Sequence, residues 1–151
     1  MLMRGGGVAG AIHKVAGKEL ESYCEQYAPI KTGEALTSPA FKLPNKYVIH
    51  AVGPKYFHDK GPAELLKTTI TNILAECEKF DIQTIALPAI STGSYGYPTK
   101  EAAEIIINIL QDWSENSPAI ARVVLFDEES YQIFINYIGF LLGDTFESSK
   151  K

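Results

Sequence analysis

The sequence has few residues of the kinds that build disulfide frameworks or metal sites. It contains only two cysteines, Cys24 and Cys77, and they form no closely spaced pair. Its three histidines, His13, His50 and His58, are also scattered along the chain. This spacing indicates neither a disulfide framework nor a metal site, and it favours a reducing compartment. We therefore expect no metal ion and no other cofactor.

Long hydrophobic runs and an excess of positive charge are also lacking. No stretch approaches the roughly 18 apolar residues of a membrane-spanning helix, and the N-terminus lacks the charged-then-apolar profile of a signal peptide. The net charge of -4 provides no basic field for an extended nucleic acid. We expect an intracellular, cytoplasmic protein with a small partner and no membrane partner, although these features fit the nucleus equally well.

The composition is that of a single globular domain. The chain has 151 residues, of which 46% are hydrophobic and 21% are charged, so it can bury one sizeable core. Glycines 5–7 and the Ser/Lys tail over 148–151 are its only low-complexity segments. We expect one domain over residues 1–151.

The spacing of apolar residues predicts helices alternating with strands. The predicted helices cover residues 8–26, with a division at Gly17, then 62–80, 99–114 and 129–138. The predicted strands cover residues 34–41 and 47–52, paired antiparallel, and 84–90 and 122–126, both buried. This order predicts a three-layer α/β/α sandwich around a mixed, mostly parallel sheet.

Two glycine-bearing loops precede predicted helices. Gly5, Gly6 and Gly7 lead directly into the first helix, where backbone amides can reach a phosphate. The loop over 91–98 follows a strand and supplies two glycines, several hydroxyls and the ring of Tyr95. Each loop alone is equally well explained as an ordinary tight turn. However, ligands of open α/β sheets bind at the carboxyl ends of strands, where these loops meet.

The end of the last predicted strand adds an aromatic ring and an acceptor. Phe126 would offer a face to a base, and Asp127 would offer an acceptor beside it. The alternative is that Phe126 belongs to the core.

Three ordered motifs resemble the macrodomain family, whose members bind ADP-ribose or hydrolyse ADP-ribosyl groups. The motifs are LMRGGGVAGAI over residues 2–12, YVIHAVGP over 47–54 and LPAISTGSYGYP over 87–98. The resemblance extends to about residue 138 and implies that the diphosphate lies between the two loops, with the distal ribose near Tyr95 and the adenine near Phe126. The ligand-binding residues expected from this resemblance are Gly5, Gly6, Gly7, Val8, Ile12, Ala89, Ser91, Thr92, Gly93, Ser94, Tyr95, Gly96, Phe126 and Asp127.

The chain departs from the family pattern in ways that bear on catalysis. Ala9 stands where hydrolase branches often carry an aspartate, and the asparagine usually assigned to catalysis has no counterpart. His13 is the nearest imidazole and a candidate for proton transfer, although a lone histidine on a helix is more often structural.

The primary expectation is binding of ADP-ribose or an ADP-ribosylated protein. The alternative is a mono-ADP-ribosyl hydrolase or an ADP-ribose-1''-phosphate phosphatase, and a third is a remnant that serves only as an interaction surface.

The resemblance also implies that two N-terminal strands are missing, one of them from the middle of the sheet. We consider three consequences: the sheet closes up, a second chain or homo-oligomer donates a strand, or the C-terminus supplies one. Residues 140–145 faintly resemble the missing first strand, although the tail of a helix explains them equally well.

Overall fold

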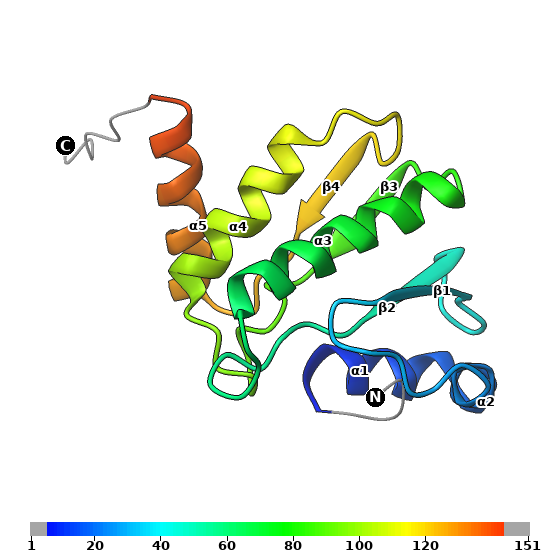
Figure 1. Ribbon diagram of the computed structural model, residues 1–151. Coiled ribbons are helices and arrows are strands. Elements are labelled where there is room, and N and C mark those ends of the chain that lie inside the picture. Colours follow the sequence, from blue (N-terminus) through cyan, green and yellow to red (C-terminus); the bar gives the residue numbers. More distant parts are fainter. Residues whose placement is uncertain (1–5, 144–151) are drawn as a thin grey trace.

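The computed structural model describes residues 6–143, and within them it forms helices and strands in the expected order (Figure 1). The helices are α1 (Gly7–Ala16), α2 (Lys18–Glu25), α3 (Pro62–Lys79), α4 (Thr99–Asp112) and α5 (Glu128–Leu141). The strands are β1 (Ala35–Pro39), β2 (Tyr47–Ala51), β3 (Thr84–Leu87) and β4 (Ile120–Val123). No described helix is both long and apolar enough to cross a membrane.

The predicted division of the first helical segment at Gly17 is confirmed. Gly17 has a φ of 90° and separates α1 from α2, a conformation that favours glycine. Its amide donates to the carbonyl of His13 and so closes the last turn of α1. The two short helices therefore change direction at one residue.

β1 and β2 form the predicted antiparallel pair. Ala40 donates to Lys46 and Val52 donates to Glu34, so the residues of even number exchange the ladder hydrogen bonds. Pro39 lies opposite Tyr47 at a position without ladder bonds, where its missing N–H costs nothing. The odd-numbered amides of β2, those of Tyr47, Ile49 and Ala51, therefore point away from β1.

β3 and β4 form a parallel pair and differ in part from the prediction. β3 ends at Leu87 rather than at residue 90, and the Leu87 carbonyl accepts the last ladder hydrogen bond, from the Val124 amide. β4 begins and ends a few residues earlier than predicted. Burial of these strands on both faces is wrong, since Thr84 and Ala86 are exposed, as are three of the four residues of β4.

The predicted mixed, mostly parallel sheet is present, within the described residues, as two separate two-stranded sheets, the antiparallel β1–β2 and the parallel β3–β4. Between β2 and β3 lies a cavity of about 830 Å³, which we call the inter-sheet slot. Its walls are residues 45–52 on the β2 side and 81–88 on the β3 side, with Val8, Ala9, Ile12 and His13 of α1. The described residues therefore do not close the sheet.

The C-terminus does not supply a strand within the described residues. Phe140 and Leu141 end α5, so the suggestion of a strand over 140–145 is wrong for these two residues. A helix is favoured there because the carbonyls of Ile138 and Phe140 accept the hydrogen bonds that close its last turn. Residues 144 and 145 lie outside the described range.

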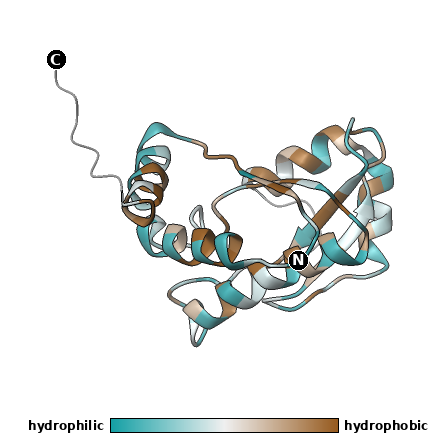
Figure 2. Cartoon of the chain, turned by 90° about the horizontal axis from the view of Figure 1, so that it is seen from above, coloured by the Kyte–Doolittle hydropathy of each residue, from teal (hydrophilic) through white to brown (hydrophobic). Residues whose placement is uncertain are grey.

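The core has two parts, which follow the separation of the sheets. The larger part joins one face of α3 to α4, β3 and α5, and the smaller part packs α1 and α2 against β1. Figure 1 shows α3 on one side of β1–β2 and α1 and α2 on the other. Figure 2 shows hydrophobic and hydrophilic residues alternating around the helices, as amphipathic packing requires. The α/β architecture is thus confirmed, with helices on both sides of the strands.

Candidate functional site

The first glycine loop leaves the start of α1 open. Gly6 precedes the helix in an extended conformation, and Gly7 begins it with a φ of 62°. Among residues 6–143, no side chain caps this end, no acidic residue lies in its first turn, and no atom lies within 4 Å of where a Cβ would stand at Gly6 or Gly7. Within this range, backbone amides and the positive end of the helix dipole are therefore accessible to an anion. Gly5 lies outside the described residues.

The second loop follows β3 and holds an unusual backbone conformation. Ser91 has a φ of 68°, a value that non-glycine residues rarely adopt. Its carbonyl accepts from the Tyr97 amide at 3.0 Å, and Gly96 donates to Gly93 at 3.0 Å. These two hydrogen bonds fold the loop back on itself. Gly93 is exposed, and no described atom lies within 4 Å of where a Cβ would stand at this position.

Ala89 and Thr92 fix the first part of this loop. The Ala89 carbonyl accepts from both the amide and the hydroxyl of Thr92, at 3.2 and 2.7 Å. The Oγ of Ser91 is buried and has no hydrogen-bond partner among the described residues. Buried hydroxyls almost always have a hydrogen-bond partner, so Ser91 is an exception within the described residues.

The end of β2 packs tightly against the same loop. A Cβ at Gly53 would meet the Ser91 hydroxyl and would come within 2.7 Å of the Ile90 Cγ2, so only glycine fits there. The Tyr56 amide donates to the Tyr95 carbonyl at 2.9 Å, which ties the two segments together. These contacts hold the second loop in one position relative to β2.

A cation lies over the Tyr95 ring. The Nζ of Lys55 is 5.5 Å from the centre of that ring, within cation–π range. The sequence interpretation missed Lys55, because only the contact between residues 53–56 and the second loop brings its ammonium here. The group adds positive charge beside the open loop, where a phosphate would benefit from it.

The inter-sheet slot brings together part of the predicted site. Val8, Ile12 and His13 line it, and Pro88 and Ile90 line it from the end of β3. The lining stops just before the second loop, so Ala89 and residues 91–96 lie outside the slot. Phe126 and Asp127 are not part of it either.

Phe126 and Asp127 occupy the turn between β4 and α5. Phe126 is fully exposed, so the alternative that placed it in the core is wrong. Asp127 caps α5, since its carboxylate accepts from the Ser130 amide at 2.8 Å. This hydrogen bond lowers the pKa of Asp127 below its ordinary value.

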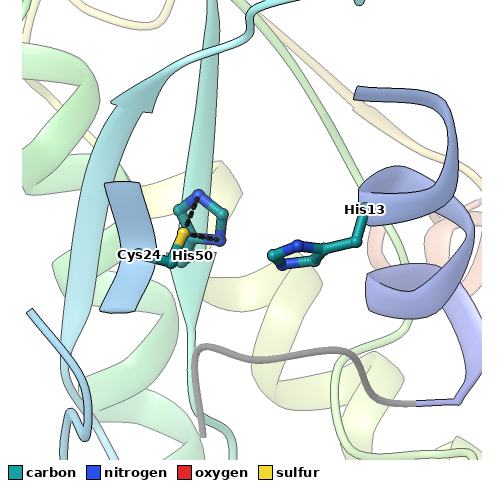
Figure 3. A group of neighbouring side chains, drawn as sticks. All are labelled: His13, Cys24 and His50. Carbon is teal, nitrogen blue, oxygen red and sulfur yellow. Dashed lines mark hydrogen bonds between the residues drawn. The ribbon is translucent and has the colours of Figure 1, made fainter. Parts of the chain in front are cut away.

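A cluster of His13, Cys24 and His50 was missed by the sequence interpretation. α1, α2 and β2 supply one residue each, and Figure 3 shows the His13 ring directed toward the other two side chains. A ligand atom of each lies within 4.8 Å of the others, so residues that are scattered along the chain lie close together in the fold. The fold joins positions that no local spacing could connect.

Burial shifts the pKa values of His50 and Cys24. Desolvation, with a further effect of nearby His13, lowers the pKa of His50 to about 4, so the imidazole is neutral at physiological pH. Burial raises the pKa of the Cys24 thiol. The sulfur lies 3.6 Å from Nε2 and 3.9 Å from Nδ1 of His50.

Comparison with known proteins assigns this fold to a family. The model of the family described as Macro domain matches residues 1–106. A protein of Salmonella newport named O-acetyl-ADP-ribose deacetylase is 41% identical over 140 residues, which are 88% of this chain and 78% of that protein.

Solved structures resemble the whole described fold. An Oceanobacillus iheyensis macrodomain with ADP has a TM-score of 0.86 and 35% identity, covering 94% of this chain and 80% of that one. A Trypanosoma brucei macrodomain in complex with ADP-ribose has a TM-score of 0.82 and 30% identity, covering 91% and 59% respectively.

Proposed function

The chain belongs to the Macro domain family, and on that basis we propose that it binds ADP-ribose or ADP-ribosyl groups through its two glycine-rich loops. The observation that carries the proposal is the uncapped, unobstructed start of α1 at Gly6 and Gly7. A diphosphate there would accept hydrogen bonds from backbone amides and interact favourably with the helix dipole. The Trypanosoma brucei relative, solved with ADP-ribose, supports the choice of ligand.

In this proposal the second loop closes on the other side of the diphosphate. Gly93 allows the backbone to approach the ligand, because no described atom lies within 4 Å of a Cβ there, and the packing of Ser91 against Gly53 holds the loop in place. The distal ribose would lie near Gly5, Gly6 and Tyr95. The predicted binding set remains Gly5 to Val8, Ile12, Ala89, Ser91 to Gly96, Phe126 and Asp127.

The exposed ring of Phe126 fits a role at the adenine. A fully exposed aromatic side chain has no packing partner to lose and offers a face on which a base can stack. Asp127 is committed to its cap on α5, so it contributes to the site by holding the turn that presents Phe126.

Thermal shift with a charge-bearing variant tests the proposal. ADP-ribose in excess should raise the Tm of the wild type by mass action. Gly6→Glu should fold normally, because no described atom lies within 4 Å of a Cβ at this position, and it should lose the shift because a carboxylate repels the diphosphate.

Val15→Glu is the matched control, since it adds the same charge at an exposed position in the last turn of α1. It should keep the ligand-induced shift. If folded Gly6→Glu responds to ADP-ribose as strongly as the wild type does, the site assignment is wrong.

Hydrolysis of an ester on the distal ribose is a second candidate, favoured by the 41% identity to the protein named O-acetyl-ADP-ribose deacetylase. Water would attack the acyl carbon, acetate would leave and the ribose would keep its hydroxyl. Ala9 offers no carboxylate to position that water, so an ordered water held by the bound substrate would act without a protein base. Mono-ADP-ribosyl esters and ADP-ribose 1''-phosphate are alternative substrates of the same site.

Chromatography of O-acetyl-ADP-ribose incubated with the protein tests this candidate. We expect the wild type to convert O-acetyl-ADP-ribose to ADP-ribose faster than buffer alone does. Gly6→Glu should lose this activity. Ala9→Asp should accelerate it, because a carboxylate in the first turn would orient the water and is favoured by the helix dipole. Conversion at the buffer rate by both wild type and Ala9→Asp would restrict the protein to binding.

We also propose a cytoplasmic setting and one domain over residues 1–151, with ADP-ribosylated protein as the macromolecular partner. Both cysteines are free thiols and both are buried, which supports a reducing compartment. The nucleus satisfies the same condition.

A further inference from the structure

We propose that His13, Cys24 and His50 form a binding site for a divalent transition metal ion of the zinc type, separate from the glycine loops. Each side chain comes from a different element, α1, α2 and β2, and the three lie together (Figure 3), with Cys24 a member of the smaller part of the core. One ligand atom of each lies within 4.8 Å of the other two. The described residues contain no other group of three potential metal ligands this close together.

The distances suit a tetrahedral ion. Zinc binds sulfur at about 2.3 Å and nitrogen at about 2.0–2.1 Å, so an N–S pair on a tetrahedral ion is about 3.6 Å apart. The Cys24 sulfur lies 3.9 Å from Nδ1 of His50 and 3.6 Å from Nε2, so Nδ1 has to move closer to the sulfur by a few tenths of an ångström to bind the same ion. His13 has to approach further, since its ligand atom lies within 4.8 Å of the other two.

His13 provides an independent indication of a ligand, because it carries a buried nitrogen without a partner. Only 4% of this residue is exposed, and its Nδ1 has no hydrogen-bond partner among the described residues. Buried polar atoms in folded proteins almost always have a partner. The ring centroids of His13 and His50 are 5.9 Å apart, which leaves room for an ion between them and the sulfur.

Ser38 on β1 orients the second imidazole. The Ser38 hydroxyl donates to the Pro39 carbonyl at 3.0 Å. Its oxygen lies 2.8 Å from Nε2 of His50, and because its own proton is used on Pro39, it accepts the hydrogen bond from Nε2. This arrangement puts the proton of His50 on Nε2 and leaves Nδ1 with a free lone pair for the metal. Metal-ligating histidines are commonly held by such a hydrogen bond on their other nitrogen.

The donor set selects the type of ion. Two imidazoles and one thiolate suit zinc, cobalt or nickel and are poor ligands for magnesium or calcium, which prefer oxygen. On binding, the Cys24 thiol releases its proton to solvent as the sulfur–metal bond forms. Three protein ligands leave a fourth position, and water can fill it from the inter-sheet slot, which His13 and His50 both line.

Titration of the metal-free 151-residue protein with Co²⁺ tests the proposal, because cobalt replaces zinc and reports its ligands optically. We expect one equivalent to produce a thiolate-to-cobalt charge-transfer band and the intense visible bands of tetrahedral cobalt. One equivalent of Zn²⁺ should then displace the cobalt and abolish both the charge-transfer band and the visible bands. Absence of the charge-transfer band in the folded wild type would overturn the proposal without any variant.

The chain offers matched controls for each ligand type. Cys24→Ser should lose the charge-transfer band and weaken Zn²⁺ binding at least about tenfold, and His50→Ala should lose tetrahedral cobalt. Cys77→Ser and His58→Ala change the remaining cysteine and the remaining histidine and should bind as the wild type does. A band that survives in Cys24→Ser, or disappears in Cys77→Ser, would place the ion elsewhere and refute the site.

Ser38→Ala separates positioning from ligation. It removes no ligand, so the charge-transfer band should remain while the affinity for Zn²⁺ falls by roughly 10- to 100-fold. An unchanged affinity would contradict the assigned role of Ser38. All variants should be checked for folding by circular dichroism before titration.

Discussion

Gly53 shows how a single residue positions the proposed ligand site. It lies just beyond β2, and its missing side chain lets Ile90 and Ser91 approach the backbone. Ser91 in turn adopts a positive φ and starts the second loop. The position of that loop therefore depends on the smallest side chain being at residue 53.

Replacing Gly53 with alanine should destabilise the protein by about 1–3 kcal/mol and lower its Tm by several degrees. The new Cβ would come within 2.7 Å of the Ile90 Cγ2, and a β-branched side chain has little freedom to move away. Denaturant unfolding monitored by circular dichroism measures the loss.

Gly93→Ala is the control for this substitution, because nothing lies within 4 Å of its Cβ. Its stability should stay within about 0.5 kcal/mol of the wild type, as surface substitutions generally do. Equal stabilities of the two variants would mean that Gly53 is not under steric constraint.

The sequence identified these glycine loops but not the contacts that position them. Glycine next to a predicted helix is visible in the sequence, whereas the contact of Gly53 with Ser91 joins residues far apart in the chain. The same applies to His13, Cys24 and His50, whose proximity depends on how α1 and α2 pack against β1.

At the scale of elements, α5 begins at a defined cap. Asp127 adopts an extended conformation and its carboxylate accepts from the Ser130 amide, which satisfies one of the free donors of the first turn. The turn that this cap closes carries Phe126. The cap therefore connects the stability of a helix to the presentation of an aromatic ring.

Asp127→Asn should lower the Tm at neutral pH, and the difference from the wild type should shrink as the pH is lowered through the acid range. The pKa of Asp127 is depressed in the folded state. The charged carboxylate therefore stabilises the protein at pH values above the ordinary pKa of an aspartate, about 3.9. That contribution is lost as the pH falls through the lower, folded value. Calorimetry over this pH range measures the effect.

Glu129→Gln removes the same charge from the first turn of α5. Among the described residues, no backbone amide donates to the Glu129 carboxylate as the Ser130 amide donates to Asp127. This variant should change the Tm less than Asp127→Asn does at neutral pH. A difference between wild type and Asp127→Asn that is constant with pH would show that the carboxylate does not act through its charge.

Helices were predicted more accurately than strands, for a physical reason. The apolar stripes of α3 and α4 are local patterns of the chain, and these helices begin at the predicted residues. The bounds and burial of β3 and β4 depend on neighbouring strands. Because β3 has no partner on its side facing β2, apolar residues expected in the interior, such as Ala86, are exposed.

At the scale of the whole molecule, the inter-sheet slot exposes two strand edges that no described strand pairs with. The odd-numbered amides of β2 point into it, as the antiparallel ladder requires. The Gln83 and Leu87 carbonyls accept from β4, so Thr84 and Ala86 turn their backbone groups toward the slot. These edges are available either to water or to a donated strand.

Amide hydrogen exchange distinguishes the occupants of the slot. In the monomer, the amides of Ile49, Ala51 and Ala86 should exchange faster than those of Val48 and His50, which bond across the β1–β2 ladder. Slow exchange at Ile49 and Ala86, together with a doubled mass in solution, would show that a second copy fills the slot. Slow exchange in a monomer would contradict the open slot itself.

Calorimetric titration of the 151-residue chain with ADP-ribose, with ADP and AMP alongside, tests the central claim most directly. Our account predicts micromolar binding of ADP-ribose at one site, with ADP and AMP weaker because they lack the distal ribose. If the folded protein binds none of the three, or binds AMP as tightly as ADP-ribose, the two glycine loops do not form the ADP-ribose site and the account is wrong.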